Sequence, residues 1–126
     1  MLKFLQLKDA YTILRFASGA VVPDWVMQGE FTSITRTADE LSIVCPSRNV
    51  SEEHQSGPHW ICLKLKGPFP FSQTGVLLSF IEPLSTNDIP IFAISTYETD
   101  YVFIPQDYAD RAFHLLRQAG HELLAA

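Results

Sequence analysis

The feature that most constrains the fold is the order of elements predicted in the second half of the sequence. His59–Lys66 has the apolar pattern of a mostly buried strand, and Val76–Leu84 carries apolar residues at helical spacing. Two further strands, Ile89–Thr96 and Asp100–Ile104, follow, and a last helix starts at Pro105. The second half therefore reads as strand, helix, strand, strand, helix.

That order is typical of a split βαβ, or ferredoxin-like, unit that lacks only its last strand. The first half predicts a similar series of short elements: the strands Leu2–Leu7, Tyr11–Phe16, Glu30–Thr37 and Glu40–Cys45, and one helical turn at Trp25–Gln28. We therefore expect an α+β protein with two tandem ferredoxin-like βαββαβ units and antiparallel sheets.

The polar stretch Pro46–Pro58 is the best candidate for a linker between the two units. It predicts a degenerate N-terminal unit over residues 1–58 and a C-terminal unit over residues 59–126. The pattern leaves open which unit owns the strand Leu2–Leu7. That strand could complete the C-terminal sheet, in which case a terminal strand would be exchanged between the units.

Composition excludes several classes of protein. Of the 126 residues, 47% are hydrophobic and nine are Phe, which supplies an ample core and excludes a disordered chain. The net charge is −5 and the nine basic residues are scattered, whereas nucleic-acid binding needs clustered positive charge. The first residues are interrupted by Lys3, Lys8 and Arg15, so they predict neither a signal peptide nor a membrane span. We expect a cytoplasmic protein.

The cysteines and histidines predict neither catalysis nor a metal site. Cys45 and Cys62 lie in apolar strands, as buried reduced thiols do. A cysteine hydrolase needs a His base and an orienting group, and no nucleophile signature surrounds either thiol. The spacing of His54, His59 and Cys62 matches no common zinc pattern. We expect no catalytic residue, no metal ion and no cofactor.

The loop Gly67–Gly75 contains two Gly and two Pro directly ahead of a predicted helix, for which Ser72 is a suitable N-cap. A helix N-terminus presents backbone N–H groups and partial positive charge, which suit a carboxylate. No Lys follows Gly75, so this is not a phosphate loop. An ordinary connection between a strand and a helix explains the same residues.

The predicted hairpin Ile94–Tyr101 concentrates hydroxyl groups and two carboxylates at a turn. Thr96, Thr99 and Asp100 could bind the polar end of a small molecule, or they could serve as turn formers that bond to nearby backbone. In a βαββαβ unit this hairpin can approach the start of the first helix. An anion-binding end beside an acidic, hydroxyl-rich end suits a zwitterion.

Several segments spread over nearly the whole chain form a familiar combination. They are Trp60–Lys66, Gly67–Val76, Glu82-Pro83-Leu84 and Ile91–Tyr101 in the second half, and Val22-Pro23-Asp24-Trp25, Phe31–Thr37 and Glu40–Cys45 in the first. Together they resemble the ACT-domain family, in particular the group that includes the CASTOR arginine sensors and small bacterial tandem-ACT proteins. The strand around Ser95 also resembles aspartokinase regulatory domains.

The resemblance implies that ACT units pair side by side and bind amino acids at the interface between units. The ligand backbone would contact the loop before the first helix and a facing strand, often from another unit, and its side chain would meet the hairpin. The matching positions are Phe71, Ser72, Gln73, Thr74, Gly75 and Val76 in the loop, Ile89, Pro90 and Ile91 in the strand, and Thr96, Tyr97, Thr99 and Asp100 in the hairpin.

One position departs from the arginine sensors. Their acidic loop residue corresponds to Gln73 here, which weakens the case for a guanidinium ligand because a buried charge needs a partner. The resemblance thus implies a non-catalytic regulatory module that binds a free amino acid, forms a homodimer and acts on a partner enzyme or regulator in trans. The alternative is a structural or interaction ACT dimer without a working ligand site. Neither nucleic acid nor membrane is an expected partner.

Overall fold

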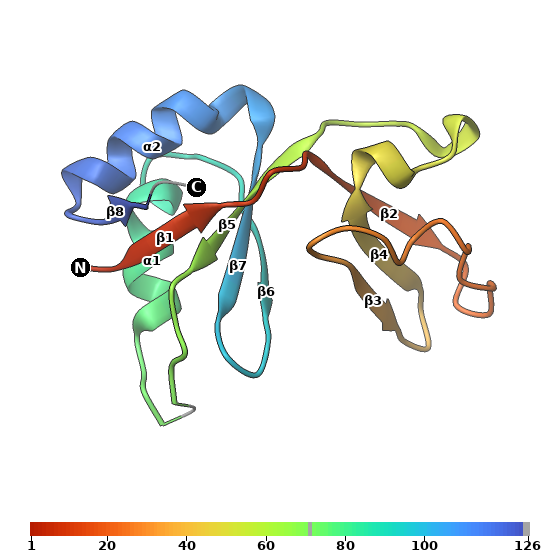
Figure 1. The fold of residues 1–126 in the computed structure, drawn as a ribbon, viewed down its shortest axis with the longest axis horizontal. Helices are drawn as coiled ribbons and strands as arrows, with labels where there is room; N and C mark the ends of the chain where they lie inside the picture. Colours follow the sequence, from red (N-terminus) through yellow and green to blue (C-terminus); the bar gives the residue numbers. More distant parts are fainter. Residues whose placement is uncertain (71, 125–126) are drawn as a thin grey trace. The chain divides into compact units, whose positions relative to one another are not determined.

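The computed structural model describes residues 1–70 and 72–124, and the chain divides into two compact units. One unit, here called the C-terminal unit, consists of Met1–Lys8 and Ile61–Ala126. The other, the N-terminal unit, consists of Asp9–Trp60. Figure 1 shows the elements of each.

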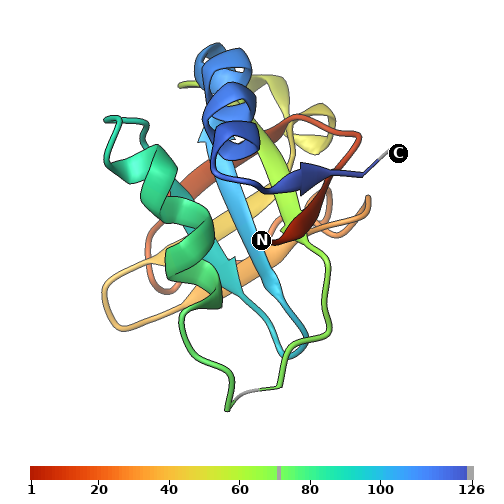
Figure 2. The ribbon, with the colours of Figure 1, turned by 90° about the vertical axis from the view of Figure 1, so that its left-hand side faces the viewer.

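The C-terminal unit is an α+β sandwich whose sheet has the strand order β6-β7-β5-β1-β8. Its two α-helices cover one face of that sheet (Figures 1 and 2). The elements are β1 Lys3–Gln6, β5 Trp60–Leu65, α1 Val76–Ser85, β6 Phe92–Ser95, β7 Asp100–Pro105, the 3₁₀ helix η3 Gln106–Tyr108, α2 Ala109–Gln118 and β8 Glu122–Leu123. From β5 to α2 the predicted series of strand, helix, strand, strand and helix is confirmed.

Strand β1 joins the sheet of the C-terminal unit. It runs antiparallel to β5 with Phe4 opposite Leu65, and the Lys66 N–H donates to the Lys3 carbonyl at 2.9 Å. Strand β8 lies parallel to β1 on its other side. The observed division therefore differs from the predicted one, which placed residues 1–8 in the N-terminal unit, because β1 finds its hydrogen-bond partners on β5.

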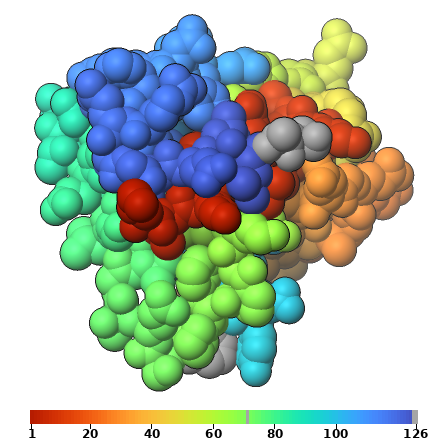
Figure 3. Space-filling view, turned by 60° about the vertical axis from the view of Figure 1, so that its left-hand side comes forward, coloured from red at the N-terminus to blue at the C-terminus, as the bar shows by residue number. Residues whose placement is uncertain are grey.

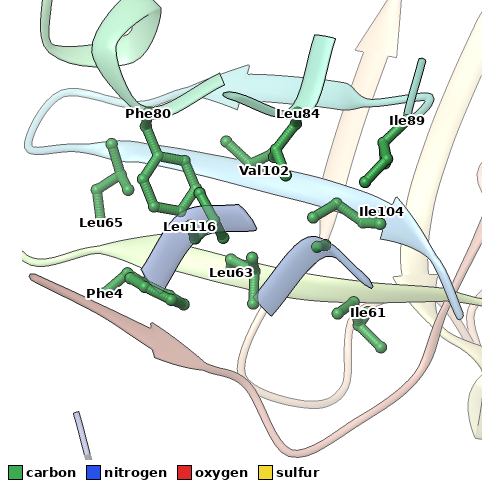
Figure 4. Packing of buried hydrophobic residues seen from close by; sticks show 11 residues of the cluster. Phe4, Ile61, Leu63, Leu65, Phe80, Leu84, Ile89, Val102, Ile104 and Leu116 are labelled. Carbon is green, nitrogen blue, oxygen red and sulfur yellow. The ribbon is translucent and has the colours of Figure 1, made fainter. Parts of the chain in front are cut away.

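The core of the C-terminal unit lies between the sheet and the two helices. Alternate residues of β1, β5 and β7 point toward α1 and α2, as the pleat of a strand requires. Burial of these apolar side chains is the main contribution to the stability of the unit. Those labelled in Figure 4 are Phe4, Ile61, Leu63, Leu65, Phe80, Leu84, Ile89, Val102, Ile104 and Leu116, each at most 5% exposed.

The N-terminal unit is built on a small antiparallel sheet with the order β3-β4-β2. Its elements are β2 Tyr11–Phe16, β3 Ser33–Arg36, β4 Leu41–Pro46 and the 3₁₀ helices η1 Ser47–Asn49 and η2 Glu52–His54. Its core contains Leu14, Val26, Leu41, Ile43, Cys45 and Val50.

Three expectations for the N-terminal unit are corrected. All of its residues are described and none lies in an α-helix, so the helices of a βαββαβ plan are missing from it. The predicted turn at Trp25–Gln28 is a simple turn, because Pro23 and Gly29 bound a stretch too short to nucleate a helix. The first part of the predicted linker Pro46–Pro58 is packed, with Ser47 and Val50 buried, whereas residues 55–58 are exposed.

Among the described residues, no helix combines the length and the apolar run that a bilayer span requires. Both α-helices have 10 residues.

Candidate functional site

The loop that leaves β5 is in direct contact with the hairpin between β6 and β7. The Phe69 N–H donates to the Glu98 carbonyl at 2.9 Å. Directly before it, a Cβ atom at Gly67 would lie 2.9 Å from the same carbonyl oxygen and 3.2 Å from the Phe69 nitrogen. Only glycine fits such a close approach of two backbones. The expected proximity of loop and hairpin is therefore confirmed.

Helix α1 begins later than predicted. Its N-cap is Gly75, in the left-handed conformation with φ 79°, and no side chain caps its first turn. Ser72 is exposed and lies in a turn in which the Gln73 N–H donates to the Pro70 carbonyl at 3.0 Å. The prediction of Ser72 as N-cap is wrong, because the left-handed residue Gly75 sets the direction of the chain into the helix. The first N–H groups of α1 still face the end of this loop without carbonyl partners inside the helix.

The hairpin turn is held by its own threonines. The Thr96 N–H and Oγ1 both reach the Thr99 carbonyl, at 2.8 and 3.1 Å. Thr99 is 6% exposed, and its Oγ1 donates to the Leu65 carbonyl at 2.7 Å. The Ser95 hydroxyl donates to the Asp100 carboxylate. The Thr99 hydroxyl thus fixes the hairpin onto β5, which is the turn-forming role that the sequence left open.

An open pocket of about 210 Å³ lies between the loop and the hairpin. Its volume corresponds to the share of about seven water molecules, which suits a small molecule. Six of the predicted positions line it: Gln73, Val76, Thr96, Tyr97, Thr99 and Asp100.

The other predicted positions lie elsewhere. Ser72, Thr74 and Gly75 belong to the loop but not to the pocket wall. The Ile89 side chain is 3% exposed and belongs to the core, against which Ile91 also packs, while Pro90 is exposed. Phe71 lies outside the described residues. The strand predicted to begin at Ile89 begins at Phe92, so residues 89–91 lie before β6. They do not reach this pocket within the chain, because Ile89 and Ile91 pack against the core.

The pocket also contains four residues that the sequence did not identify: Phe69, Pro70, Ser95 and Glu98. A signal for Glu98 was present in the sequence, since it is one of the two carboxylates of the predicted hairpin. No local pattern in the sequence indicates that Phe69 lines the pocket, because its position depends on the contact of its backbone with Glu98.

The charged side chains among the described lining residues of the pocket are all acidic. Glu98 and Asp100 line it, and none of its described lining residues is Lys, Arg or His. Val76, the first residue of α1, also lines the pocket, and a helix dipole favours an anion near the start of the helix. A cationic group would be favoured near the two carboxylates and a carboxylate near the helix start, which is the charge pattern of a zwitterion.

The residues weighed for catalysis or metal binding are separated or engaged in the scaffold. Cys45 and Cys62 are both buried, as expected. His54 Nδ1 lies 2.8 Å from the Ser51 hydroxyl, and His59 Nδ1 lies 2.8 Å from the Ser47 hydroxyl. The described residues contain no group of three or more His, Cys, Asp or Glu side chains placed to hold a metal ion.

Burial raises the pKa of Cys45 from its ordinary value of 9.0 to about 11. We expect iodoacetamide to alkylate this thiol slowly near neutral pH, where only about one molecule in 10⁴ would carry the thiolate, and faster as the pH approaches 11. Mass spectrometry of the alkylated peptides measures this, with denatured protein as the control. Rapid labelling of native Cys45 at neutral pH would instead support a reactive cysteine.

The same shift predicts the pH dependence of stability. The unfolded thiol ionises near 9.0 and the folded one near 11, so the unfolded state binds fewer protons between these values. The contribution of Cys45 to the free energy of unfolding is therefore complete below pH 9 and declines as the pH rises toward 11.

Comparisons with known proteins agree with this architecture. A family model described as an ACT domain matches residues 55–118, and a second, described as an N-terminal domain, matches residues 9–53. The human protein CASTOR3P is 30% identical over 88 residues, which is 60% of this chain. The match covers 54% of CASTOR3P, so the chain spans about half the length of this curated relative.

Two solved structures are similar over most of the chain. The protein Atu0741 from Agrobacterium tumefaciens is 42% identical, with a TM-score of 0.90 over 98% of this chain and 92% of its own. The protein VC0802 from Vibrio cholerae, described as of unknown function, has a TM-score of 0.73 over 94% of this chain and 89% of its own. It is 15% identical, so it shows the fold alone.

Proposed function

The chain belongs to the ACT-domain family, and from this premise we propose that it is a non-catalytic regulatory module that binds a free amino acid and acts on a partner in trans. The observation that carries the proposal is the pocket between the loop and the hairpin, with Glu98 and Asp100 on its wall and the start of α1 beside it. A site with both kinds of charge suits the ammonium and carboxylate groups of an amino acid.

Gln73 restricts the ligand. It lines the pocket with an uncharged amide, which can donate and accept hydrogen bonds but cannot balance a second positive charge. If one carboxylate holds the α-ammonium group, the site has a single carboxylate left for a side chain. That remaining carboxylate could balance one cationic side chain, so the charge count alone does not exclude arginine. Gln73, which replaces the acidic loop residue of the arginine sensors, is the reason that a neutral or shorter amino acid is proposed.

The site of the proposed module would be completed by a second copy of the chain. The pocket is open, and Ile89-Pro90-Ile91, which the family resemblance places near the ligand, lie away from it in their own chain. In the proposed homodimer, the backbone of this segment would face the pocket of the other copy. The N-terminal unit would then be a degenerate ACT-like unit in tandem with the C-terminal one, with β1 as the exchanged terminal strand.

The proposal is tested by a thermal-shift screen with each of the twenty free amino acids at millimolar concentration. A ligand that binds only the folded state raises the unfolding temperature in proportion to RT ln(1 + [L]/Kd). The expected result is a shift with one amino acid or a small group of them. If none of them stabilises the protein, the sensor function is excluded.

The variant Asp100→Asn locates the ligand. It removes one carboxylate charge but keeps an oxygen that accepts the Ser95 hydrogen bond, so the hairpin should fold as before. We expect affinity for the amino acid found in the screen to fall roughly tenfold, as for the loss of one charge-assisted hydrogen bond. Isothermal titration calorimetry measures the affinity, and denaturation measures the stability.

Asp88→Asn is the matched control, because Asp88 lies outside the pocket and asparagine tolerates its φ of 61°. Unchanged affinity of Asp100→Asn, with the control also unchanged, would place the ligand elsewhere.

A second candidate function is a structural or interaction dimer without a ligand. The observation that favours it is the engagement of Thr99 with Leu65 and of Asp100 with Ser95, which commits both side chains to the scaffold. A stable dimer in sedimentation experiments, together with no thermal shift from any amino acid, would support this function.

A further inference from the structure

Three lysines lie together on the sheet face that the helices of the C-terminal unit leave uncovered. Phe4, Leu63 and Leu65 point into the core, so Lys3, Lys64 and Lys66, at alternate positions of β1 and β5 and just after β5, point to the other face. Lys3 and Lys66 are directly opposite each other, since the Lys66 N–H donates to the Lys3 carbonyl at 2.9 Å. These three residues are here called the lysine face.

The lysine face is positively charged, whereas the whole chain carries a net negative charge. The chain has a net charge of −5, yet three of its nine basic residues gather here. Among the described residues, none of the three forms an ion pair; the Lys64 ammonium lies 5.9 Å from the centre of the Tyr101 ring. Like charges directly opposite on neighbouring strands destabilise a sheet. An acidic partner would turn this repulsion into attraction.

Lys66 lines two hollows of the surface. One hollow, of about 190 Å³, is lined by Leu5, Lys64, Lys66, Gly67, Pro68, Glu98 and Thr99. The other, of about 290 Å³, is lined by Met1, Leu2, Lys3, Lys66, Gly67 and Phe69. Figure 3 shows the first residues of the chain, in red, next to the light-green segment that follows β5.

The two hollows share Lys66 and Gly67 as lining residues. A small anion would fill one of them and meet two lysines at most. An extended chain with acidic side chains at alternate positions can meet Lys64 and Lys66 together, and Lys3 lies opposite Lys66 on the same face. Lys64 and Lys66 are two residues apart, about 6.7 Å along the strand, which is also the spacing of alternate side chains in an extended peptide.

From this arrangement we infer that the lysine face is a docking surface for an extended acidic segment of a partner protein, with carboxylates at alternate positions. One hollow shares Glu98 and Thr99 with the candidate amino-acid pocket, so the docked segment would contact the hairpin turn that forms that pocket. Only this link between the two sites rests on the proposed function. Binding to the lysine face itself requires no amino acid.

Two acidic residues near the lysine face reduce its attraction for an acidic segment. Glu98 lines one hollow, and Glu122 lies opposite Lys3 on β8. Both would repel an acidic segment. The favourable region is therefore centred on Lys66, and removal of the Glu98 charge should strengthen binding rather than weaken it.

The test is fluorescence anisotropy with a labelled, blocked peptide of sequence Glu-Ser-Glu-Ser-Glu, added to the whole chain at low ionic strength without amino acids. Two control peptides have the sequences Gln-Ser-Gln-Ser-Gln, without charge, and Glu-Glu-Glu-Ser-Ser, with the same charge but no alternation. We expect saturable binding of the alternating peptide, weaker binding of the contiguous one and none of the neutral one. Added salt should weaken it, since the lysines are exposed or half-buried.

Four variants complete the experiment. Lys66→Gln should weaken binding roughly threefold, and the triple variant Lys3→Gln, Lys64→Gln, Lys66→Gln roughly thirtyfold, as expected for three exposed ion pairs. Glu98→Gln should strengthen binding. Arg111→Gln, on the exposed surface of α2, changes the net charge as Lys66→Gln does and should leave binding unchanged.

Several results would overturn the inference. They are no binding of the alternating peptide, equal loss in Arg111→Gln and Lys66→Gln, or equal affinity for the two charged peptides. Full competition by inorganic phosphate at a concentration matched to the peptide would also overturn it, because it would identify a site for small anions. A failed amino-acid screen together with peptide binding that the triple variant abolishes would exclude the proposed sensor function and leave the docking surface standing.

Discussion

Replacement of Phe80 by alanine is expected to lower the free energy of unfolding of the C-terminal unit by about 3–5 kcal/mol. Phe80 is fully buried on α1. The centre of its ring lies 5.1 Å from the centre of the Phe4 ring and 5.3 Å from that of the His121 ring. The substitution removes the aromatic contact between α1 and β1 and leaves a cavity that the surrounding core can fill only in part. A loss of this size is a large fraction of the stability of a typical small domain.

The measurement is denaturant unfolding followed by far-ultraviolet circular dichroism. The α-helices of the described residues both belong to the C-terminal unit, so the helical signal reports the unfolding of this unit. Leu78→Ala is the control on the same helix. Leu78 is 62% exposed, so the stability of this variant should stay within about 0.5 kcal/mol of the wild type. Similar losses in the two variants would contradict the assignment of Phe80 to the core.

Gly67→Ala is expected to have the second large effect, because it affects both the fold and the candidate pocket. The added Cβ would lie 2.9 Å from the Glu98 carbonyl oxygen, a backbone atom that cannot rotate away. Such overpacking costs about 1–3 kcal/mol. The hairpin turn would have to move, and with it the hydrogen bond from Phe69 to Glu98 and the wall of the pocket. Amino-acid binding should therefore weaken more than stability alone predicts.

Gly19→Ala is the matched control, since a Cβ atom added at Gly19 would have no other atom within 4 Å and the φ of this residue is not positive. It should leave both stability and binding close to those of the wild type. Denaturation and the thermal-shift experiment, with and without the amino acid, measure the two effects separately. If Gly67→Ala behaves like Gly19→Ala, the loop and the hairpin do not meet at Gly67 in solution.

The order of elements in the C-terminal unit could be predicted because each element has a recognisable pattern of apolar residues within a short stretch of sequence. Val76, Phe80 and Leu84 recur at helical spacing, and β5 is a continuous apolar run, so each is recognisable within a few residues. The unit to which β1 belongs cannot be predicted from neighbouring residues alone. Its pairing with β5 joins Phe4 to Leu65, and only the sheet as a whole determines which strand takes that place.

The candidate site was predicted in part for a similar reason. The loop and the hairpin were identifiable from Gly, Pro and Thr chemistry, and six predicted side chains line one pocket. The start of α1 at Val76 depends on the left-handed conformation of Gly75, which the sequence allows but does not require. The sequence places Ile89 at the site, but its side chain lies in the core cluster that contains Leu84 and Ile104.

The N-terminal unit was predicted least well. The strand expected at Glu30–Thr37 is limited to Ser33–Arg36, three of whose four residues are exposed. The stretch taken as a linker forms η1 and η2, held by bonds from the Gln55 side chain to the carbonyls of Ser47 and Val50, both at 3.0 Å. Short 3₁₀ helices have little periodicity of their own, so a polar segment that packs through side-chain hydrogen bonds looks like a loop in the sequence.

The pairing of β1 with β5 makes the N-terminal unit an insertion in a hairpin of the C-terminal one. The Leu7 N–H donates to the Cys62 carbonyl at 3.0 Å, so the chain leaves the C-terminal unit after Lys8 and re-enters it at Ile61, beside the point of departure. Strand β1 is synthesised before β5, and the whole inserted unit lies between them. Strand β1 therefore stays unpaired until residues 9–60 and β5 have been synthesised. Residues 9–60 can therefore complete their own sheet before the C-terminal unit can close, and this long-range closure gives the C-terminal unit the higher contact order.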